Sequence, residues 1–530
     1  MHSSGTIEYR AESAQDQRDH RQSSLAVVDQ LVDQPVDQPV NQINTVCQTQ
    51  EMRRVLFISY AFPPNVEVGA YTCAQIARYL PMYGWKPVVL TVKEKYIKEK
   101  QPNRDGAASA TDSDLIIRTA LLPHLLDIYR LFKSNSLTSR LLRAGNQLVA
   151  PSVAGGENKS ASIGRSSARD LLLSLLSIPD TYTGWLIPAV VTGLRVIKRT
   201  KAQAIYSSAP YFTAHLAGCA LALLTGLPLV AHFRDPWITG MHPEYRLNEL
   251  YFRIGRALER MTVACARAVI CVTEEHAALM RAAYNQMPAS KFGVVMNGFD
   301  GSEWKEADEA LAQSAQCGAT EPRKFRITYA GRLYMKRNPT PLFRALRTLI
   351  DAGEIEREEV SVELIGWCES SEGRSLVGLI SETGVGDCVE MIGPLNHFDT
   401  LRRLSQSDLL LLLAEGLVIQ VPAKTFEYLK TCRPILALAS EGAVANLLRR
   451  TGGGWVVKPN DQEGIIAAVR ECYYLWKHNL PCPRPDPFVV DSFDRRKTTG
   501  RIAELLNSLS TSPHNTERRC AKISTNRHQA

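Results

Sequence analysis

Short apolar runs alternate with stretches of helical spacing along most of the chain. The first run, VLFI at 55–58, is followed by Pro63 and Pro64 and then by apolar residues at helical spacing over 70–83. Gly84 ends this helix, and KPVVLTV supplies the next strand. A continuous apolar run of strand length is typical of a strand buried on both faces of a parallel sheet. The pattern therefore predicts a strand, helix and strand in succession.

The alternation continues in two series. The first contains helices 186–198, 211–225 and 247–266 and strands 204–208, 228–233 and 268–272. The second contains strands 325–331, 360–366, 389–393, 409–414 and 434–439 and helices 339–352, 372–383, 423–431 and 443–451. Strands that alternate with helices predict doubly wound parallel sheets, whose ligands bind beyond the carboxyl ends of the strands. We predict an α/β fold with two Rossmann-like domains facing a central cleft.

Length and composition set the boundaries of these domains. A chain of 530 residues exceeds the roughly 250–300 residues at which single cores stop growing. We expect an N-terminal domain at 51–300, a C-terminal domain at 301–480 and a crossover helix region at 481–510. The polar segment 1–50, with its repeat DQPVDQPVNQ, and the basic tail 511–530 are predicted to be disordered.

A variable insertion at about 98–170 interrupts the first series. It contains the amphipathic stretch LLPHLLDIYRLFKSNSLTSRLLRAG between two flexible segments. This stretch is compatible with a membrane surface, with a partner, or with packing on its own domain.

Charge and cysteines indicate a cytoplasmic protein. The net charge is +8, of which the last sixteen residues contribute a good share, so the body is only mildly basic. No two of the 12 cysteines have C-x-x-C spacing. The N-terminus does not read as a secretory signal, and the longest apolar stretch, 211–233, is interrupted by Gly226 and Pro228. Basic residues are not interleaved with aromatics, which argues against nucleic-acid binding.

Seven segments together resemble the family-four glycosyltransferases, in particular a bacterial branch used in polysaccharide assembly. They are LFISYAFPPNVEVGA, IPDTYTGW, IYSSAPYFTAHLAG, AHFRDPW, VMNGFD, YAGRLYMKRNP and VPAKTFEYLKTCRPILALA. The resemblance spans about residues 53 to 470. It implies the GT-B fold and retaining transfer of a sugar from a UDP- or GDP-linked donor to a glycan or lipid-linked acceptor, without a cofactor or metal. Peripheral association with the inner membrane face stays open.

The resemblance places the donor diphosphate against the loop YAGRLYMKRNP, in the C-terminal domain. Arg332, Lys336 and Arg337 lie on this loop between a strand and a helix. Arg337 fits the family's second basic residue, with Arg332 as its partner. Lys336 is one position off the pattern and reads equally as a solvated side chain.

The segment VPAKTFEYLK is expected to complete the donor site. Pro422 is predicted to start a helix whose N-terminus favours anions, and Lys424 is placed to reach a phosphate. Glu427 matches the family's second glutamate, which resembles a ribose ligand; the alternative is a carboxylate stabilised by the helix dipole. Two positions depart from the family pattern, because Ile419 stands where the first glutamate is common and Ala423 where glycine is usual.

The N-terminal domain is expected to hold the acceptor and the reacting sugar. Gly69 would let the backbone approach the sugar or acceptor closely. Arg234 and Asp235 of AHFRDPW follow a strand and are predicted to touch acceptor or transferred sugar, as catalytic candidates with Gly69. His232 within that strand reads better as a core histidine.

Asn297 and Gly298 in VMNGFD form a turn signal at the entrance to the second domain, for which a structural role is favoured. The segment DPFVVDSFDRRKTTGRIAELLNSL resembles the terminal helix that braces the two domains.

Two other functions are compatible with these motifs. GT-B-like sugar-nucleotide epimerases share the fold but would need acid–base carboxylates across the cleft. A non-catalytic relative that binds a glycan or scaffolds a complex would explain Ile419 and Ala423.

Overall fold

The structure is a computed structural model, which describes residues 52–97, 115–123, 178–241, 248–304, 323–334 and 336–510. The predicted tails 1–50 and 511–530 lie outside the described residues, as do most of the insertion 98–170 and most of its amphipathic stretch. The chain from Arg53 onward forms one compact unit.

The first sheet has seven parallel strands in the order β3-β2-β1-β4-β5-β6-β7. These strands are β1 (Arg53–Ile58), β2 (Trp85–Val92), β3 (Ile116–Thr119), β4 (Ala204–Ala209), β5 (Leu229–Phe233), β6 (Ala268–Cys271) and β7 (Phe292–Val294). The strand order reverses between β1 and β4, which is the switch point at which doubly wound sheets bind their ligands.

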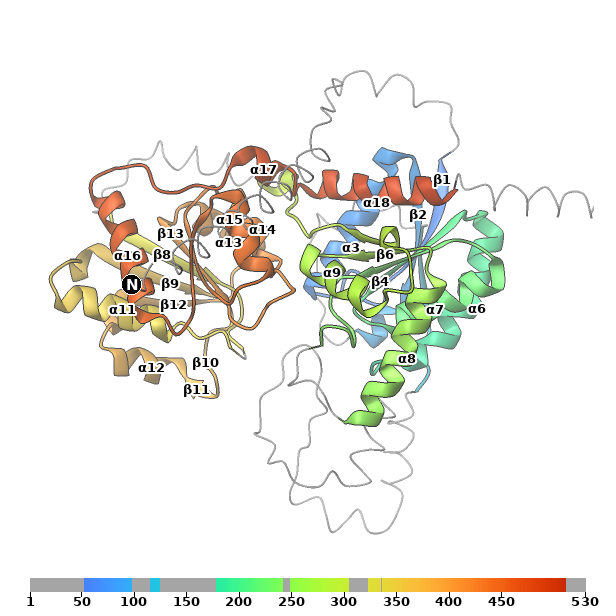
Figure 1. Cartoon of the computed structure of the whole chain (residues 1–530), viewed down its shortest axis with the longest axis horizontal. Helices are drawn as coiled ribbons and strands as arrows, with labels where there is room; N and C mark the ends of the chain where they lie inside the picture. Colours follow the sequence, from blue (N-terminus) through green and yellow to red (C-terminus); the bar gives the residue numbers. More distant parts are fainter. Residues whose placement is uncertain are drawn as a thin grey trace, which may run out of the picture. The chain divides into compact units, whose positions relative to one another are not determined.

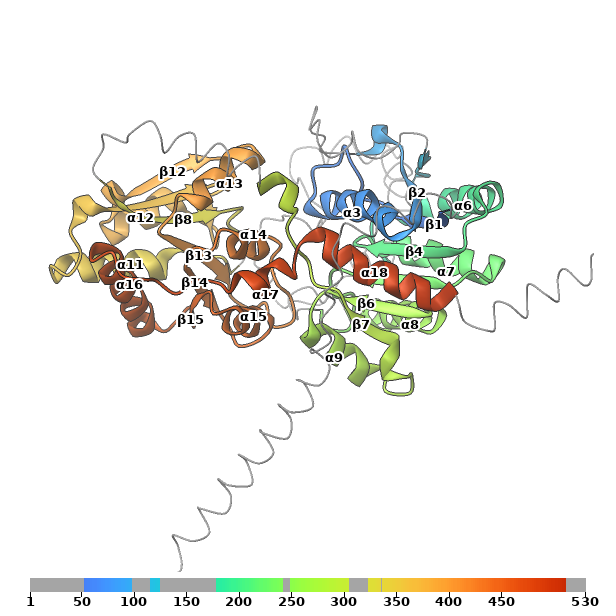
Figure 2. The same ribbon diagram turned by 90° about the horizontal axis from the view of Figure 1, so that it is seen from above.

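Helices cover both faces of this sheet (Figures 1 and 2). They are α3 (Val68–Tyr79), α6 (Leu186–Thr200), α7 (Thr213–Thr225), α8 (Glu249–Cys265) and α9 (Glu274–Ala283). One apolar cluster joins the sheet to α6, α7 and α8, and a second joins its other face to α3. This two-sided burial explains why the strands are continuous apolar runs rather than alternating ones.

The second sheet has six parallel strands in the order β12-β9-β8-β13-β14-β15. They are β8 (Phe325–Ala330), β9 (Val360–Ile365), β12 (Val389–Gly393), β13 (Leu409–Ala414), β14 (Ile435–Ala439) and β15 (Gly454–Val457). A separate antiparallel pair, β10 (Ser370–Ser371) and β11 (Arg374–Ser375), follows β9. The order reverses between β8 and β13.

Helices also cover both faces of the second sheet. They are α11 (Thr340–Asp351), α12 (Leu376–Thr383), α13 (His397–Ser405), α14 (Lys424–Lys430), α15 (Ala443–Thr451) and α16 (Gln462–Lys477). One apolar cluster contains residues of α11, α12 and α16, and the other contains residues of α13, α14 and α15. The two sheets confirm the predicted α/β fold with two Rossmann-like halves.

The sequence pattern missed the strands β3, β7 and β15 and the helices α9, α13 and α16, besides the two-residue strands β10 and β11. The three strands have only three or four residues, and each forms the edge of its sheet. An edge strand is buried on fewer sides, so its sequence lacks a long apolar run. The helices α9 and α13 are short and carry several charged residues.

The chain returns to the first sheet through α17 (Pro487–Asp491) and α18 (Arg495–Ser510). Ile502, Ala503 and Leu506 of α18 are buried in the apolar cluster that contains α3, and Figure 2 shows α18 beside α3. The backbone of Phe299 pairs with Asp494, so the segment after β7 and the segment before α18 run together.

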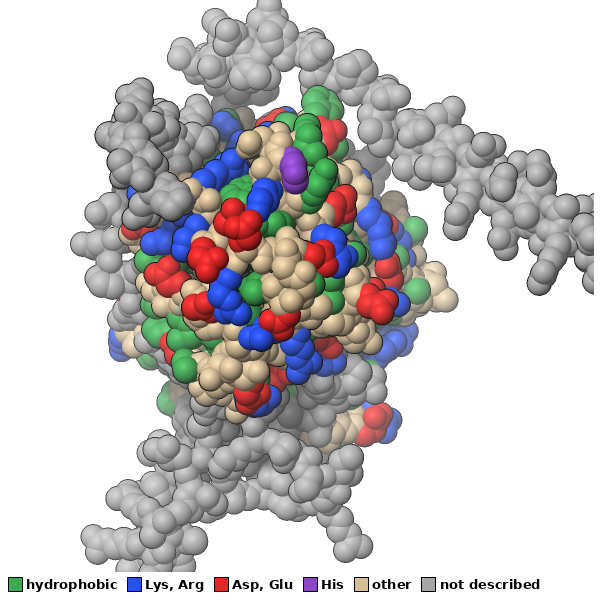
Figure 3. Space-filling view, turned by 90° about the vertical axis from the view of Figure 1, so that its left-hand side faces the viewer, with side chains coloured by type: hydrophobic (Ala, Val, Ile, Leu, Met, Phe, Trp, Pro, Cys, Tyr) green, Lys and Arg blue, Asp and Glu red, His purple; other side chains and the backbone are tan. Residues whose placement is uncertain are grey.

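Positive and negative side chains are interspersed on the face shown in Figure 3. Ion pairs such as Arg470–Glu354 and Lys477–Glu356 join α16 to the segment before β9. None of the described helices is both long enough and apolar enough to cross a membrane.

We expect Gly298→Ala to destabilise the protein, because a Cβ at this position would lie 1.9 Å from the carbonyl oxygen of Phe493. Forcing the two backbone segments apart costs about 1–3 kcal/mol, which corresponds to roughly 2–4 °C in Tm for each kcal/mol. Thermal unfolding of the full chain measures the shift. Gly378→Ala is the matched control, because its Cβ would meet its nearest neighbour only at 4.0 Å. Equal Tm values for the two variants would contradict the expected clash.

Candidate functional site

The loops that follow β8 and β9 are locked together at the carboxyl edge of the second sheet. The N–H of Gly331 donates to the carbonyl of Ile365, and that of Leu333 donates to the carbonyl of Trp367, at 2.8 and 3.0 Å. Gly366 has φ +111°, and a Cβ there would lie 2.4 Å from the carbonyl oxygen of Gly331. Only glycine allows this approach, so the backbone that carries Arg332 is fixed by its neighbour.

The three predicted basic residues of this loop separate in the structure. The exposed Arg332 lies over the ring of Trp367, with its Cζ 5.9 Å from the ring centroid. The half-buried Arg337 lies 4.0 Å over the ring of Tyr334, and it lies close enough to Tyr329 for its charge to oppose the rise in the pKa of that hydroxyl caused by burial. Lys336 is also half-buried. Arg337 is therefore directed toward Tyr329, whereas Arg332 contacts the neighbouring loop.

Lys424 meets Arg337 at the same tyrosine. Its Nζ lies 3.7 Å over the ring of Tyr329 and donates a hydrogen bond of 3.0 Å to the carbonyl of Ala330, the last residue of β8. Burial lowers the pKa of Lys424 well below its usual value, and the positive charge of Arg337 adds to this effect. Two cations that disfavour each other's charged form make this point suitable for an anion.

The helix expected at Pro422 begins later than predicted. Its first residue is Lys424, with Ala423 as N-cap, and the carbonyl of Pro422 accepts from the N–H of Thr425. Pro422 therefore lies two residues before the helix, where its missing N–H leaves no helical hydrogen bond unmade. Glu427 is half-buried on α14, and its negative charge partly opposes the lowering of the pKa of Lys424.

In the first half of the chain, Arg234 and Gly69 are brought into contact. Arg234 follows β5 and is 7% exposed. Its Nε donates to Ser208 Oγ at 2.9 Å and its Nη1 donates to the carbonyl of Gly69 at 3.0 Å. A Cβ on Gly69 would lie 2.8 Å from Nη2 of Arg234. Gly69 thus provides the space that the guanidinium fills, at the carboxyl edge beside the β1–β4 switch point.

Asp235 contacts the loop that precedes α14. Nε2 of Gln420 donates to Oδ1 of Asp235 at 2.9 Å, and the Thr273 hydroxyl donates to the carbonyl of Ile419 at 2.6 Å. Burial raises the pKa of Asp235, while Arg234 and the hydrogen bond from Gln420 oppose this shift. Residues from the two sheets therefore meet at the position where the family pattern commonly has a glutamate.

The other predicted residues lie away from this meeting point or in the core. His232 is 2% exposed, and its Nδ1 lies 2.5 Å from the hydroxyl of Tyr206, with burial lowering its pKa. The carbonyl of Gly298 accepts a hydrogen bond of 2.8 Å from the guanidinium of Arg495, and Asn297 and Gly298 lie in irregular chain between β7 and the pairing of Phe299 with Asp494. Among the residues that the structure describes, no group of His, Cys, Asp or Glu side chains could hold a metal ion.

Three residues of the site escape sequence reasoning: Tyr329, Gln420 and Glu259. Tyr329 reads as one more apolar residue of a strand, and Gln420 stands in an irregular loop. Glu259 reads as a polar residue on the surface of a helix, yet it is fully buried. It accepts hydrogen bonds from the N–H groups of Ile238 and Thr239 and from the hydroxyl of Tyr284. It thereby anchors the segment that follows Asp235.

Comparisons with solved structures agree with the fold. The Anabaena protein Alr3699/HepE, in a complex with UDP and glucose, is 15% identical, with a TM-score of 0.52 over 86% of this chain and all of that one. WaaG, a glycosyltransferase involved in lipopolysaccharide biosynthesis, is 15% identical, with a TM-score of 0.50 over 85% of this chain and 99% of its own. The N-terminal domain of the Candida albicans trehalose-6-phosphate phosphatase is 13% identical, with a TM-score of 0.55 over 86% and 97% of the two chains.

Two family models match the sequence itself. Residues 135–303 match Glycosyltransferase Family 4, and residues 315–479 match Glycosyl transferases group 1. No curated protein sequence matches. The two matches together span more than half of the chain, one on each Rossmann-like half, and the arrangement of the sheets is that of GT-B structures. The first half of the chain therefore carries a Glycosyltransferase Family 4 domain and the second half a Glycosyl transferases group 1 domain, the combination of a family-four-like glycosyltransferase.

Proposed function

We propose that the protein transfers a sugar from a UDP- or GDP-linked donor to a glycan or lipid-linked acceptor, with retention of the anomeric configuration. The observation that carries the proposal is the meeting of Arg337 and Lys424 at Tyr329, at the carboxyl end of β8. Transfer from such a donor requires that the charge on the departing diphosphate be stabilised. Two partly desolvated cations at one point provide this stabilisation.

The second half of the proposal concerns the first sheet. Arg234, held by Ser208 and Gly69, presents a fixed positive charge beside Asp235, which is held in turn by Gln420. A carboxylate and a guanidinium with fixed positions can orient the hydroxyls of a sugar. We assign Arg234, Asp235 and Gly69 to the acceptor and the transferred sugar, and Arg332, Lys336, Arg337, Lys424 and Glu427 to the donor.

The relatives support the chemistry of the two substrates. Alr3699/HepE was crystallised with UDP-glucose and with UDP and glucose, which supports a uridine-linked donor. WaaG is involved in lipopolysaccharide biosynthesis, which supports a glycan or lipid-linked acceptor. The resemblance to the retaining enzymes of family four supports retention.

We expect Arg337→Ala and Glu427→Ala each to abolish turnover of the sugar nucleotide, because the first removes a phosphate contact and the second a ribose ligand. Loss of a charge-stabilising group costs about 10²- to 10³-fold in kcat. Release of UDP or GDP, measured across a panel of sugar nucleotides, reports the activity. Arg344→Ala and Glu463→Ala, two exposed residues of the same half, are the controls. Unchanged turnover in both site variants would refute the donor assignment, and conversion of the donor without any acceptor would identify an epimerase instead.

We expect Gly69→Ala to slow transfer with little loss of stability. The added methyl displaces the guanidinium of Arg234, which is the end of a flexible side chain. A displacement of about 1 Å in a reacting group can cost roughly 10²-fold in rate. Steady-state kinetics and thermal unfolding are compared with those of Gly378→Ala. Wild-type kcat in Gly69→Ala would show that the position of Arg234 does not matter for transfer.

We expect the protein to take up a proton when it binds UDP or GDP. Burial and Arg337 depress the pKa of Lys424 in the free protein, and a diphosphate beside it would restore the charged form. Affinity should therefore fall as the pH rises above the depressed pKa of the free protein. Calorimetry at about pH 8.5, well above the phosphate pKa of about 6, measures the uptake in buffers of different ionisation enthalpy.

Lys424→Met should bind more weakly and show no dependence of the binding enthalpy on the buffer. Arg344→Ala should retain the wild-type dependence. An equal binding enthalpy in all buffers for the wild-type protein would exclude Lys424 from the phosphate site.

A further inference from the structure

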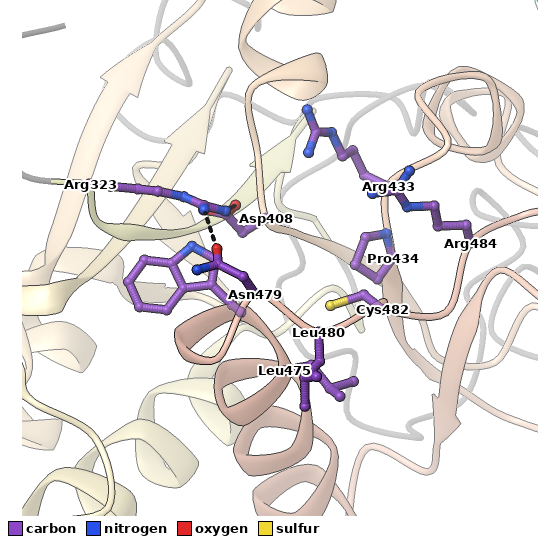
Figure 4. A pocket seen from close by; sticks show the side chains of 10 residues that line it. Arg323, Asp408, Arg433, Pro434, Leu475, Asn479, Leu480, Cys482 and Arg484 are labelled. Carbon is purple, nitrogen blue, oxygen red and sulfur yellow. Dashed lines mark hydrogen bonds and ion pairs between the residues drawn. The ribbon is translucent and has the colours of Figure 1, made fainter.

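A pocket lies at the edge of the second sheet opposite to the donor residues (Figure 4). Arg323 stands two residues before β8, Asp408 directly before β13, and Arg433 two residues before β14. Arg484 and the end of α16, with Trp476, complete its wall. The donor residues follow the carboxyl ends of these strands, whereas the pocket lies at their amino ends.

The pocket contains more positive than negative charge. Its one carboxylate, Asp408, is already engaged: Oδ1 accepts from Nη2 of Arg323 at 3.1 Å, and Oδ2 accepts from the backbone N–H of Arg326 at 3.0 Å. Within the described part of the chain, the guanidinium groups of Arg433 and Arg484 have neither a hydrogen-bond acceptor nor an ion-pair partner. Asp408 is thus paired with one of the three guanidinium groups, and no carboxylate of the described residues forms an ion pair with the other two.

Arg433 is partly withdrawn from water. Burial lowers its pKa; Arg484 and Arg323 lower it further, and Asp408 opposes them. Positive charges that lie close together with little water around them raise the free energy of the empty pocket. A bound anion would lower this free energy by offsetting their repulsion. Several exposed arginines on this half differ, because Arg470, Arg347 and Arg449 each have a carboxylate partner.

Trp476 also lines the pocket. Nε1 of Trp476 is buried and finds no acceptor among the described residues, while Arg323 lies 5.3 Å over the indole ring. Figure 4 shows Arg323 bonded to Asn479 on one side of the pocket and Arg433 and Arg484 on the other. A group with several strong acceptor oxygens would satisfy the two guanidinium groups, whereas the indole N–H is covered by protein atoms.

We propose that this pocket binds a dianionic phosphoryl group, as a site separate from the donor site and independent of the proposed transfer reaction. Guanidinium groups bind phosphate oxygens through paired N–H donors, and two guanidinium groups that have no carboxylate partner match a dianion. The phosphoryl group could belong to a soluble phosphorylated molecule or to a lipid headgroup, and the test separates the two sources.

Phosphate binding is measured by calorimetry on the full chain, with sodium chloride added to match the ionic strength. Because the donor site also attracts phosphate, the Arg337→Gln variant serves as the background. We expect the Arg337→Gln variant to retain saturable phosphate binding. The affinity of the triple variant Arg337→Gln, Arg433→Gln, Arg484→Gln should be lower by about tenfold at least. Adding Arg344→Gln instead should change nothing. Equal binding by the triple variant, or no binding in the Arg337→Gln background, would overturn the proposal.

Cys482 gives a second measurement that needs no substitution. It lines the pocket, and a hydrogen bond from Cys472, followed by the charges of Arg484 and Arg323, lowers its pKa. A phosphate ion between these arginines would weaken their effect and reduce the thiolate fraction. Inorganic phosphate should therefore slow alkylation of Cys482 severalfold, as followed by peptide mass spectrometry, whereas chloride at equal ionic strength should not. Equal rates in both salts would count against the site.

Vesicles separate the two sources of the phosphoryl group. If a lipid supplies it, binding to vesicles that contain phosphatidic acid, a phosphomonoester, should fall in Arg433→Gln/Arg484→Gln but not in Arg344→Gln. If that variant binds vesicles like the wild-type protein while losing phosphate, a soluble phosphorylated molecule is the ligand.

Discussion

One buried guanidinium joins the segments on which both sheets depend. Arg495, at the start of α18, donates from Nε to Gln75 of α3 and from Nη2 to the carbonyl of Gly298, and its backbone N–H donates to the carbonyl of Phe299. Burial lowers the pKa of Arg495 to about 10. The hydrogen bonds of the guanidinium offset the free energy that is lost when this charge is removed from water. The chain leaves the first sheet and returns to it at this point. The segment 298–299, which leads to the second sheet, and the helix α18, which packs on α3, would therefore shift together if this contact changed.

The candidate site is built on that fixed frame from residues that follow strands. Arg234 follows β5, Gly331 follows β8, and the loop 415–421 follows β13, so each side chain or loop begins from a backbone that the sheet already holds. Two glycines allow the close approaches in the site: Gly69 leaves room for the guanidinium of Arg234, and Gly366 for the carbonyl of Gly331. The hydrogen bond between Asp235 and Gln420 then joins the first half of the site to the second. Any motion that separates the two halves must break this contact, and its partners are buried or half-buried.

The sequence predicted what depends on local pattern and missed what depends on tertiary neighbours. Central strands such as β1, β8 and β13 are apolar throughout because helices cover both faces, and their positions could be predicted from this alone. The edge strand β7 and the short helix α13 lack such a signal. The helix expected to start at Pro422 starts at Lys424, because the backbone hydrogen bonds that define its first turn cannot be predicted from the sequence. Arg337 and Lys424 could be assigned to one site from motifs, but the tyrosine that joins them, and the burial of Glu259, follow from the packing of distant segments.

The second sheet carries cationic groups at both of its ends. Lys424 at the carboxyl ends and Arg433 at the amino ends each have a pKa lowered by burial and by a neighbouring cation. The six residues of β13 separate the two ends by about 20 Å, at roughly 3.3 Å for each residue. This distance is more than twice the Debye length of about 8 Å at physiological ionic strength. Two anions bound at the two ends would therefore repel each other very little through the solvent, so both ends can be occupied at once. Any coupling between them would have to pass through a shift of β8 or β13 themselves, the strands that carry residues of both sites.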